Sequence, residues 1–324
     1  MTRVLSGLAY AARIGLGLIA GLALLLAAMG GLGHLYRMTA KAPYQLIEVE
    51  PGRRLHVACD GPEAAPFVLY DAGAFGIYTD GWWIKDALKD DYRVCLYDRA
   101  GMGWSDPVPE GVSPGPLWHV EDMRRLRAAL GEDRPFVLIG HSMAGLRLHA
   151  YANLHPSELQ GLVFVDAARP QSVRAERIQA FIPWVLRAMT IGTGLARIGI
   201  AGGMSYLLPD ELDLPKQQKQ DKRRSIASVK HHKAAKAEIA AAMRVDESPD
   251  WMSGSGAETR PVAVYSNSEG GGANASVATA AETNAGFGRI RSLTDETHVS
   301  LLNQKNAELI ANDVRDMIQG SFVK

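Results

Sequence analysis

The sequence predicts an α/β fold, a mostly parallel β-sheet covered by helices, and three observations lead to this prediction. Short, continuous apolar runs bounded by turn residues recur from residue 44 onward. Segments with apolar residues at spacings of three and four separate them. Hydrophobic residues make up 47% of the 324 residues, which suffices for one large domain with a core. Continuous apolar runs are typical of strands buried on both faces, and strands that alternate with helices form doubly wound sheets.

The predicted strands follow in order along the chain. The first six are residues 44–50, 54–58, 67–71, 93–97, 136–140 and 162–165. Helical patterns at residues 81–88, 120–130 and 146–154 alternate with the later ones. A connection between parallel neighbours needs such a crossover helix, so this alternation supports the parallel arrangement.

The alternation of strands and helices stops after residue 168. Residues 169–258 show helical stretches and no clear strand, and their first half is unusually apolar. That half fits either packing on the core or the lining of a pocket for an acyl chain. Strand character resumes at residues 261–266 and 290–293, and a terminal helix covers 306–318. We therefore divide the chain into an N-terminal segment (1–40), a core (41–168), a helical lid (169–258) and the rest of the core (259–324).

The N-terminal segment contains a run of about 20 residues without a charge, residues 14–33. As a helix, such a run would cross the roughly 30 Å of a bilayer's hydrocarbon core. It is longer than the apolar region of a cleavable signal, which is the alternative interpretation. We expect a single-pass membrane anchor in residues 1–40. The flanking positive charges do not decide its orientation, and the short N-terminal head favours a main domain outside the cytoplasm.

Charge and cysteine content narrow the class of protein further. Lys and Arg together number 35, as do Asp and Glu, so the formal net charge is zero. This balance gives no sign of a nucleic-acid partner, which favours a basic face, and no protein partner is indicated. Cys59 and Cys95 are the only cysteines and lack the spacing of a zinc site. We expect two buried thiols, with a disulfide as the alternative in an oxidising compartment.

One motif carries chemistry. Residues 136–145 read FVLIGHSMAG, a buried strand that runs into a tight turn at Ser142 and then into a helix. Such a turn needs small residues two before and two after the serine, and Gly140 and Ala144 meet that need. Glycine is more usual where Ala144 stands, and alanine is the mildest departure. The turn lifts the Ser142 hydroxyl to the positive end of a helix, where the Met143 N–H can stabilise an oxyanion.

Two further runs accompany this turn, DAGAFG from Asp71 and DRAGMGWSD from Asp98. Together the three runs resemble the α/β-hydrolase superfamily, over about residues 44–168 and 261–318. The resemblance implies an eight-stranded, mostly parallel sheet with a lid after the sixth strand. It also implies that the Ala74 N–H joins that of Met143 in an oxyanion hole, and that the run from Asp98 is structural.

The remaining triad residues come from later in the chain. His298 is the histidine that follows the eighth strand, so we expect it to be the general base. The superfamily's usual acid position, after the seventh strand, offers only Glu269. The end of the sixth strand offers Asp166. We prefer Asp166, because it follows a rigid strand whereas three glycines follow Glu269. The structural alternative for Asp166 is a cap on the lid's first turn.

These residues predict a serine hydrolase that cleaves an ester, thioester or amide bond of a small, fairly apolar molecule. No metal or organic cofactor is implied. A serine nucleophile argues against the epoxide-hydrolase and dehalogenase chemistry that uses aspartate in this superfamily. Two alternatives stay open. One is acyl transfer, perhydrolysis or carbon–carbon bond hydrolysis by the same triad, and the other is a non-catalytic binding protein on the same fold.

Overall fold

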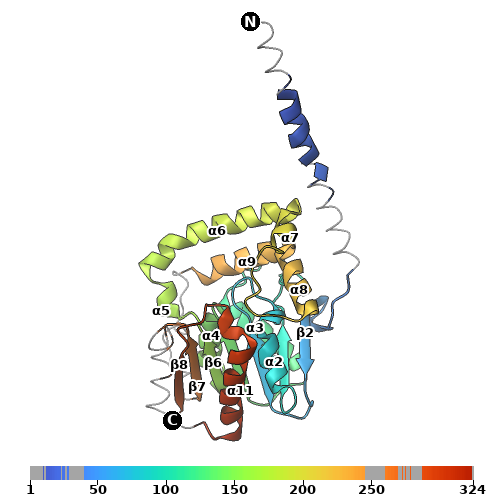
Figure 1. Ribbon diagram of the computed structural model, residues 1–324. Helices are drawn as coiled ribbons and strands as arrows, with labels where there is room; N and C mark the ends of the chain where they lie inside the picture. Colours follow the sequence, from blue (N-terminus) through green and yellow to red (C-terminus); the bar gives the residue numbers. More distant parts are fainter. Residues whose placement is uncertain are drawn as a thin grey trace.

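A computed structural model describes residues 10, 12–22, 24, 25, 28, 40–244, 260–268, 272, 274, 278 and 287–322. Within this part of the chain one eight-stranded sheet has the order β1-β2-β4-β3-β5-β6-β7-β8 (Figure 1). Strand β2 is antiparallel to both of its neighbours, and the pairs from β4 to β8 are all parallel. The prediction of an α/β fold with a mostly parallel eight-stranded sheet is confirmed.

The strands begin and end close to the predicted positions. Their bounds are β1 Gln45–Glu50, β2 Arg53–Asp60, β3 Phe67–Asp71, β4 Arg93–Tyr97, β5 Phe136–His141, β6 Leu159–Val165, β7 Val262–Ser266 and β8 Gly288–Ser292. Every residue of the central strands β3 and β5 is buried, as their continuous apolar runs require. Parallel pairing brings the carboxyl ends of β3, β5 and β6 to one edge of the sheet, where ligands bind in open α/β folds.

Helices cover both faces of the sheet. Their bounds are η1 Tyr78–Gly81, α2 Trp82–Leu88, α3 Pro116–Ala129, α4 Ala144–Leu154, η2 Pro156–Glu158, η6 Ser300–Leu302 and α11 Gln304–Gln319. Helices α2 and α11 pack on each other and share one hydrophobic core with the sheet. Helices α3 and α4 pair in the same way and belong to the second core. The sheet is thus the middle of three layers.

The lid helices lie between β6 and β7. Their bounds are α5 Pro170–Val173, α6 Glu176–Arg197, α7 Ile200–Met204, α8 Lys216–Ile226 and α9 Val229–Ala242. Figure 1 shows α6 along the outer edge of the molecule, with α9 beneath it and nearer the sheet. One side of α6 packs on α9. Its other side leaves Phe181, Trp184 and Ile191 more than half exposed.

The expected membrane anchor is wrong. In the described part of the chain, no helix has both the length and the apolar character needed to cross a membrane. The described residues 12–22, 24, 25 and 28 of the N-terminal segment are helical. Residues 23, 26, 27 and 29–33 of the charge-free run lie outside the described residues.

The prediction rested on the absence of charge and left the glycine content of the run out of account. Residues 14–33 include six glycines, and glycine disfavours helix by about 1 kcal/mol relative to alanine. The predicted single-pass anchor, with the membrane contact and the localisation drawn from it, is therefore not supported.

The expectation of two free thiols is also wrong, since Cys59 and Cys95 form a disulfide. They face each other directly in the antiparallel pairing of β2 with β4. The disulfide thus fastens the one strand with reversed direction to the parallel part of the sheet.

Candidate active site

Ser142 occupies the turn between β5 and α4 in a conformation that serine rarely adopts. Its φ is +55°, in the left-handed region, which costs a non-glycine residue free energy. Backbone hydrogen bonds hold it there. The Ser142 N–H donates to the Val165 carbonyl (3.1 Å), and the Ser142 carbonyl accepts from the N–H groups of Gly145 (3.0 Å) and Ala168 (2.8 Å). The end of β6 therefore fixes the turn.

Small residues around Ser142 are required by close contacts. A Cβ atom at Gly140 would lie 2.4 Å from Leu148 Cδ1. One at Gly145 would lie 2.2 Å from the Ala168 carbonyl oxygen. Ala144 is fully buried and is accommodated without glycine. Sequence reasoning placed the second small-residue requirement at Ala144 and missed Gly145, where the turn comes closest to the chain beyond β6.

Asp166 and His298 lie in contact, although 132 positions separate them in sequence. Asp166 directly follows β6, has a φ of +39° and donates its N–H to the Tyr265 carbonyl at 2.7 Å. His298 follows β8, and its Nδ1–H donates to Asp166 Oδ2 at 2.5 Å. The His298 side chain is 46% exposed and that of Asp166 24%. Glu269, the alternative acid, lies outside the described residues.

A second histidine supports His298 from the nucleophile side. The Nε2–H of His141, the residue before Ser142, donates to the His298 carbonyl at 2.9 Å, and the two rings lie 4.5 Å apart. Burial, and to a lesser extent the neighbouring His298, lower the pKa of His141 to about 4. His141 is therefore a neutral donor at pH 7. Within the described residues, no hydrogen bond joins Ser142 Oγ to His298, a contact that often forms only with substrate bound.

The loop after β3 passes directly beside Ser142. A Cβ atom at Gly73 would lie 2.8 Å from the Cβ of Ser142, so only glycine allows this approach. Ala74, the next residue, is half-buried. Met143 is 8% exposed and immediately precedes α4. The two predicted oxyanion donors, Ala74 and Met143, thus directly follow Gly73 and Ser142, which lie in contact. Their role stays a prediction.

A cluster of four buried charges lies behind this loop. Arg147 from α4 donates to Asp71 (2.5 Å) and Glu238 (2.6 Å), and Arg99 donates to the same two carboxylates (3.3 and 3.0 Å). None of these side chains is more than 2% exposed. Burial lowers the pKa of Arg99, but the carboxylates of Glu238 and Asp71 more than offset this and raise it. Sequence reasoning treated the run from Asp98 as structural and missed this cluster.

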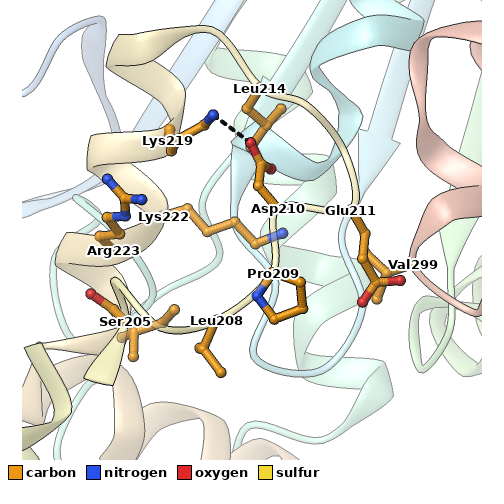
Figure 2. A pocket seen from close by; sticks show the side chains of 11 residues that line it. Ser205, Leu208, Pro209, Asp210, Glu211, Leu214, Lys219, Lys222, Arg223 and Val299 are labelled. Carbon is orange, nitrogen blue, oxygen red and sulfur yellow. Dashed lines mark ion pairs between the residues drawn. The ribbon is translucent and has the colours of Figure 1, made fainter. Parts of the chain in front are cut away.

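A pocket opens between α8 and the segment that precedes it (Figure 2). Its volume is about 230 Å³, and its lining includes Val299, the neighbour of His298. Its polar wall consists of charges that largely neutralise one another. Lys219 pairs with Asp210 at 2.7 Å, and Lys222 pairs with Asp80 at 3.0 Å. The remaining lining is Ser205, Leu208, Pro209, Glu211, Leu214, Arg223 and Ile226.

Comparison with known proteins identifies the family. The sequence profile of the alpha/beta hydrolase fold family matches residues 72–234, half of the chain. The protein is a member of the α/β-hydrolase family. The matched region runs from the loop beside Ser142 through the nucleophile turn into α9, and membership supports a hydrolytic function for this α/β-hydrolase.

Curated relatives and solved structures agree with this family. An uncharacterised protein of Schizosaccharomyces pombe is 30% identical over an alignment of 170 residues that covers 43% of this chain and 31% of that protein. A thermophilic esterase from Thermogutta terrifontis matches with a TM-score of 0.59 at 20% identity, over 88% of this chain and all of that one. An epoxide hydrolase from Vigna radiata matches with a TM-score of 0.64 at 15% identity, over 86% and 98%. The two structures share the fold. The match covers about a third or less of the length of each of the first curated relatives.

Proposed function

We propose that this α/β-hydrolase is a serine hydrolase that cleaves an ester, thioester or amide bond of a small, fairly apolar molecule. The observation that carries the proposal is the 2.5 Å hydrogen bond from His298 Nδ1 to Asp166 Oδ2. A carboxylate in this position keeps the imidazole's other nitrogen free to accept a proton and stabilises the imidazolium that results. The Ser142 turn lies at the same edge of the sheet.

The steps follow from these positions. Ser142 Oγ attacks the substrate carbonyl carbon and passes its proton to His298 Nε2. The N–H groups of Met143 and Ala74 donate to the oxyanion that forms. His298 then returns the proton to the leaving alcohol, thiol or amine, and the acyl group stays on Ser142. A water molecule, deprotonated by His298, then attacks the acyl carbon, and His298 returns the proton to Ser142 Oγ as the bond to the serine breaks and the acid leaves.

The pocket supports an uncharged, apolar substrate. Four aliphatic side chains line it, namely Leu208, Leu214, Ile226 and Val299, the last of which follows His298 in sequence. Two of its lysines are already paired with aspartates, which weakens their attraction for an anion. Its volume suits a short acyl or alcohol group, because drug-sized ligands need about 300–1,000 Å³.

Labelling with a fluorophosphonate tests the nucleophile directly. The full-length chain should be labelled at Ser142 and should hydrolyse p-nitrophenyl esters, with a preference among chain lengths set by the pocket. Ser142→Ala should abolish both, because the hydroxyl is the covalent centre. Ser205→Ala, which changes a serine of the pocket wall, should still be labelled. Retained turnover of Ser142→Ala at a tenth of the parental rate would contradict the assignment, and an inert parental chain would favour the non-catalytic binding protein.

A further inference from the structure

The loop at residues 72–76 is held by two guanidinium groups. Arg99 donates from Nη1 to the Ala72 carbonyl and from Nη2 to the Gly73 carbonyl, both at 2.7 Å. Arg147 also donates to the Ala72 carbonyl at 2.7 Å. The Gly73 carbonyl and the Ala74 N–H belong to one planar trans peptide unit, in which the two groups point in opposite directions. When Arg99 fixes that carbonyl, it therefore also fixes the direction of the Ala74 N–H.

The lid supplies half of the negative charge that holds these guanidinium groups. Glu238 on α9 accepts from Arg147 at 2.6 Å and from Arg99 at 3.0 Å, while Asp71 binds both from the core side. His119 lies 3.8 Å from Glu238, and burial, with the two arginines nearby, holds its pKa well below the usual range. Two positive and two negative charges thus balance in a site that water does not reach.

A second residue of α9, His231, contacts the 72–76 loop directly, whereas Glu238 acts on it through the two arginines. The Gly103 N–H donates to His231 Nδ1 at 3.1 Å, so the ring proton of His231 is on Nε2. That proton is donated to the Phe75 carbonyl, also at 3.1 Å. Burial lowers the pKa of His231 to about 4, which keeps this arrangement at pH 7. Phe75 needs such support, because its φ of +60° is unfavourable for a residue with a side chain.

We propose that helix α9 is a positioning element of the oxyanion hole. Glu238, through Arg99 and Arg147, and His231, through the Phe75 carbonyl, hold the 72–76 loop so that the Ala74 N–H faces the reacting carbonyl. This inference rests on the proposed function. It gives this part of the lid a role in the chemical step, besides covering the site, and makes hydrolysis dependent on the docking of α9.

Glu238→Gln tests the proposal, with Glu158→Gln as the matched control. Glu158 also accepts from two arginines, Arg124 and Arg127, but it lies in η2 and touches neither the loop nor Ser142. An oxyanion hole acts on the transition state, so Glu238→Gln should lower kcat and the fluorophosphonate labelling rate at least about tenfold while KM stays within about threefold. Glu158→Gln should leave kcat and the labelling rate at the parental level.

A second variant covers the case in which Glu238→Gln does not fold. His231→Phe keeps a ring against Phe75 and removes the hydrogen bond to its carbonyl, and it should also lower kcat without raising KM. Circular dichroism establishes which variants are folded. A folded Glu238→Gln or His231→Phe protein that labels at the parental rate with unchanged kcat overturns the proposal. A parental chain that is not labelled at Ser142 refutes the proposed function itself, and the inference with it.

Discussion

The two sides of Ser142 differ sharply in their access to water. The oxyanion side contains four charged side chains that are at most 2% exposed and form four ion pairs with one another: Asp71, Arg99, Arg147 and Glu238. On the acid–base side, His298 is 46% exposed and has one carboxylate partner. The difference fits the two tasks that we propose for these sides. Charge stabilisation works best from fixed groups in a dry site, whereas a base must meet the water that hydrolyses the acyl group.

The largest effect is expected on the acid–base side. Asp166→Asn should lower kcat by about 10⁴, because an amide does not stabilise the imidazolium and favours the wrong tautomer of His298. The fold should remain, since both groups are partly solvated. Steady-state hydrolysis and circular dichroism measure the two effects.

Glu269→Gln is the counterpart of this variant and should be nearly silent. The reverse ranking, with a silent Asp166→Asn, would move the acid to Glu269. It would leave Asp166 as a cap on the lid's first turn.

On the oxyanion side, loss of a buried charge should lower the free energy of unfolding. Arg147→Met removes one guanidinium group and leaves Asp71 and Glu238 with only Arg99 between them in a dry site. Breaking a buried ion pair costs about 3–5 kcal/mol of unfolding free energy, because the remaining charge is uncompensated. Urea unfolding at pH 7 measures it. A loss below about 1 kcal/mol, typical of exposed pairs, would mean that water reaches this cluster and would remove the contrast between the two sides.

Lower pH should affect both sides alike. Burial lowers the pKa values of His141, on the acid–base side, and His231, on the oxyanion side, to about 4. An unfolded histidine titrates near 6.5, so the unfolded chain binds more protons between pH 6.5 and 4. Stability is therefore fully present above pH 6.5 and falls as the pH drops through this window.

By pH 5 each of these histidines should cost on the order of 2 kcal/mol. His141→Asn and His231→Phe should each reduce, by similar amounts, the loss of unfolding free energy between pH 7 and 5. Urea unfolding at the two pH values measures this loss. Unequal reductions would show that one ring is more solvated than the other, and no reduction in either variant would exclude buried neutral histidines.

Local patterns made the sheet and the nucleophile turn predictable. Continuous apolar runs marked the strands, and the small residues around Ser142 marked the turn. Asp166 could be preferred over Glu269 because a rigid strand precedes it, although the sequence alone left both open. The role of each triad residue stays a prediction.

The buried charge cluster and the disulfide could not be predicted, because they depend on contacts between residues that are distant in sequence. Glu238 is 139 positions from Arg99 and lies in a lid helix, so no local pattern connects it with the loop after β3. The disulfide joins residues 36 positions apart, and only the pairing of β2 with β4 places them face to face. The membrane-anchor prediction was wrong for a different reason: it rested on a local hydropathy pattern alone, and no helix in the described part of the chain is long and apolar enough to cross a membrane.

The left-handed residues of the site have a consequence for engineering. Phe75, Ser142 and Asp166 are three of the four non-glycine residues with positive φ in the described part of the chain. Each such conformation costs about 1–3 kcal/mol, and glycine or asparagine would relieve part of it. Directed evolution toward heat resistance alone would therefore favour replacing residues to which we assign roles in the proposed hydrolysis. Libraries for a more robust enzyme should keep these three positions fixed and take their gains from the rest of the chain.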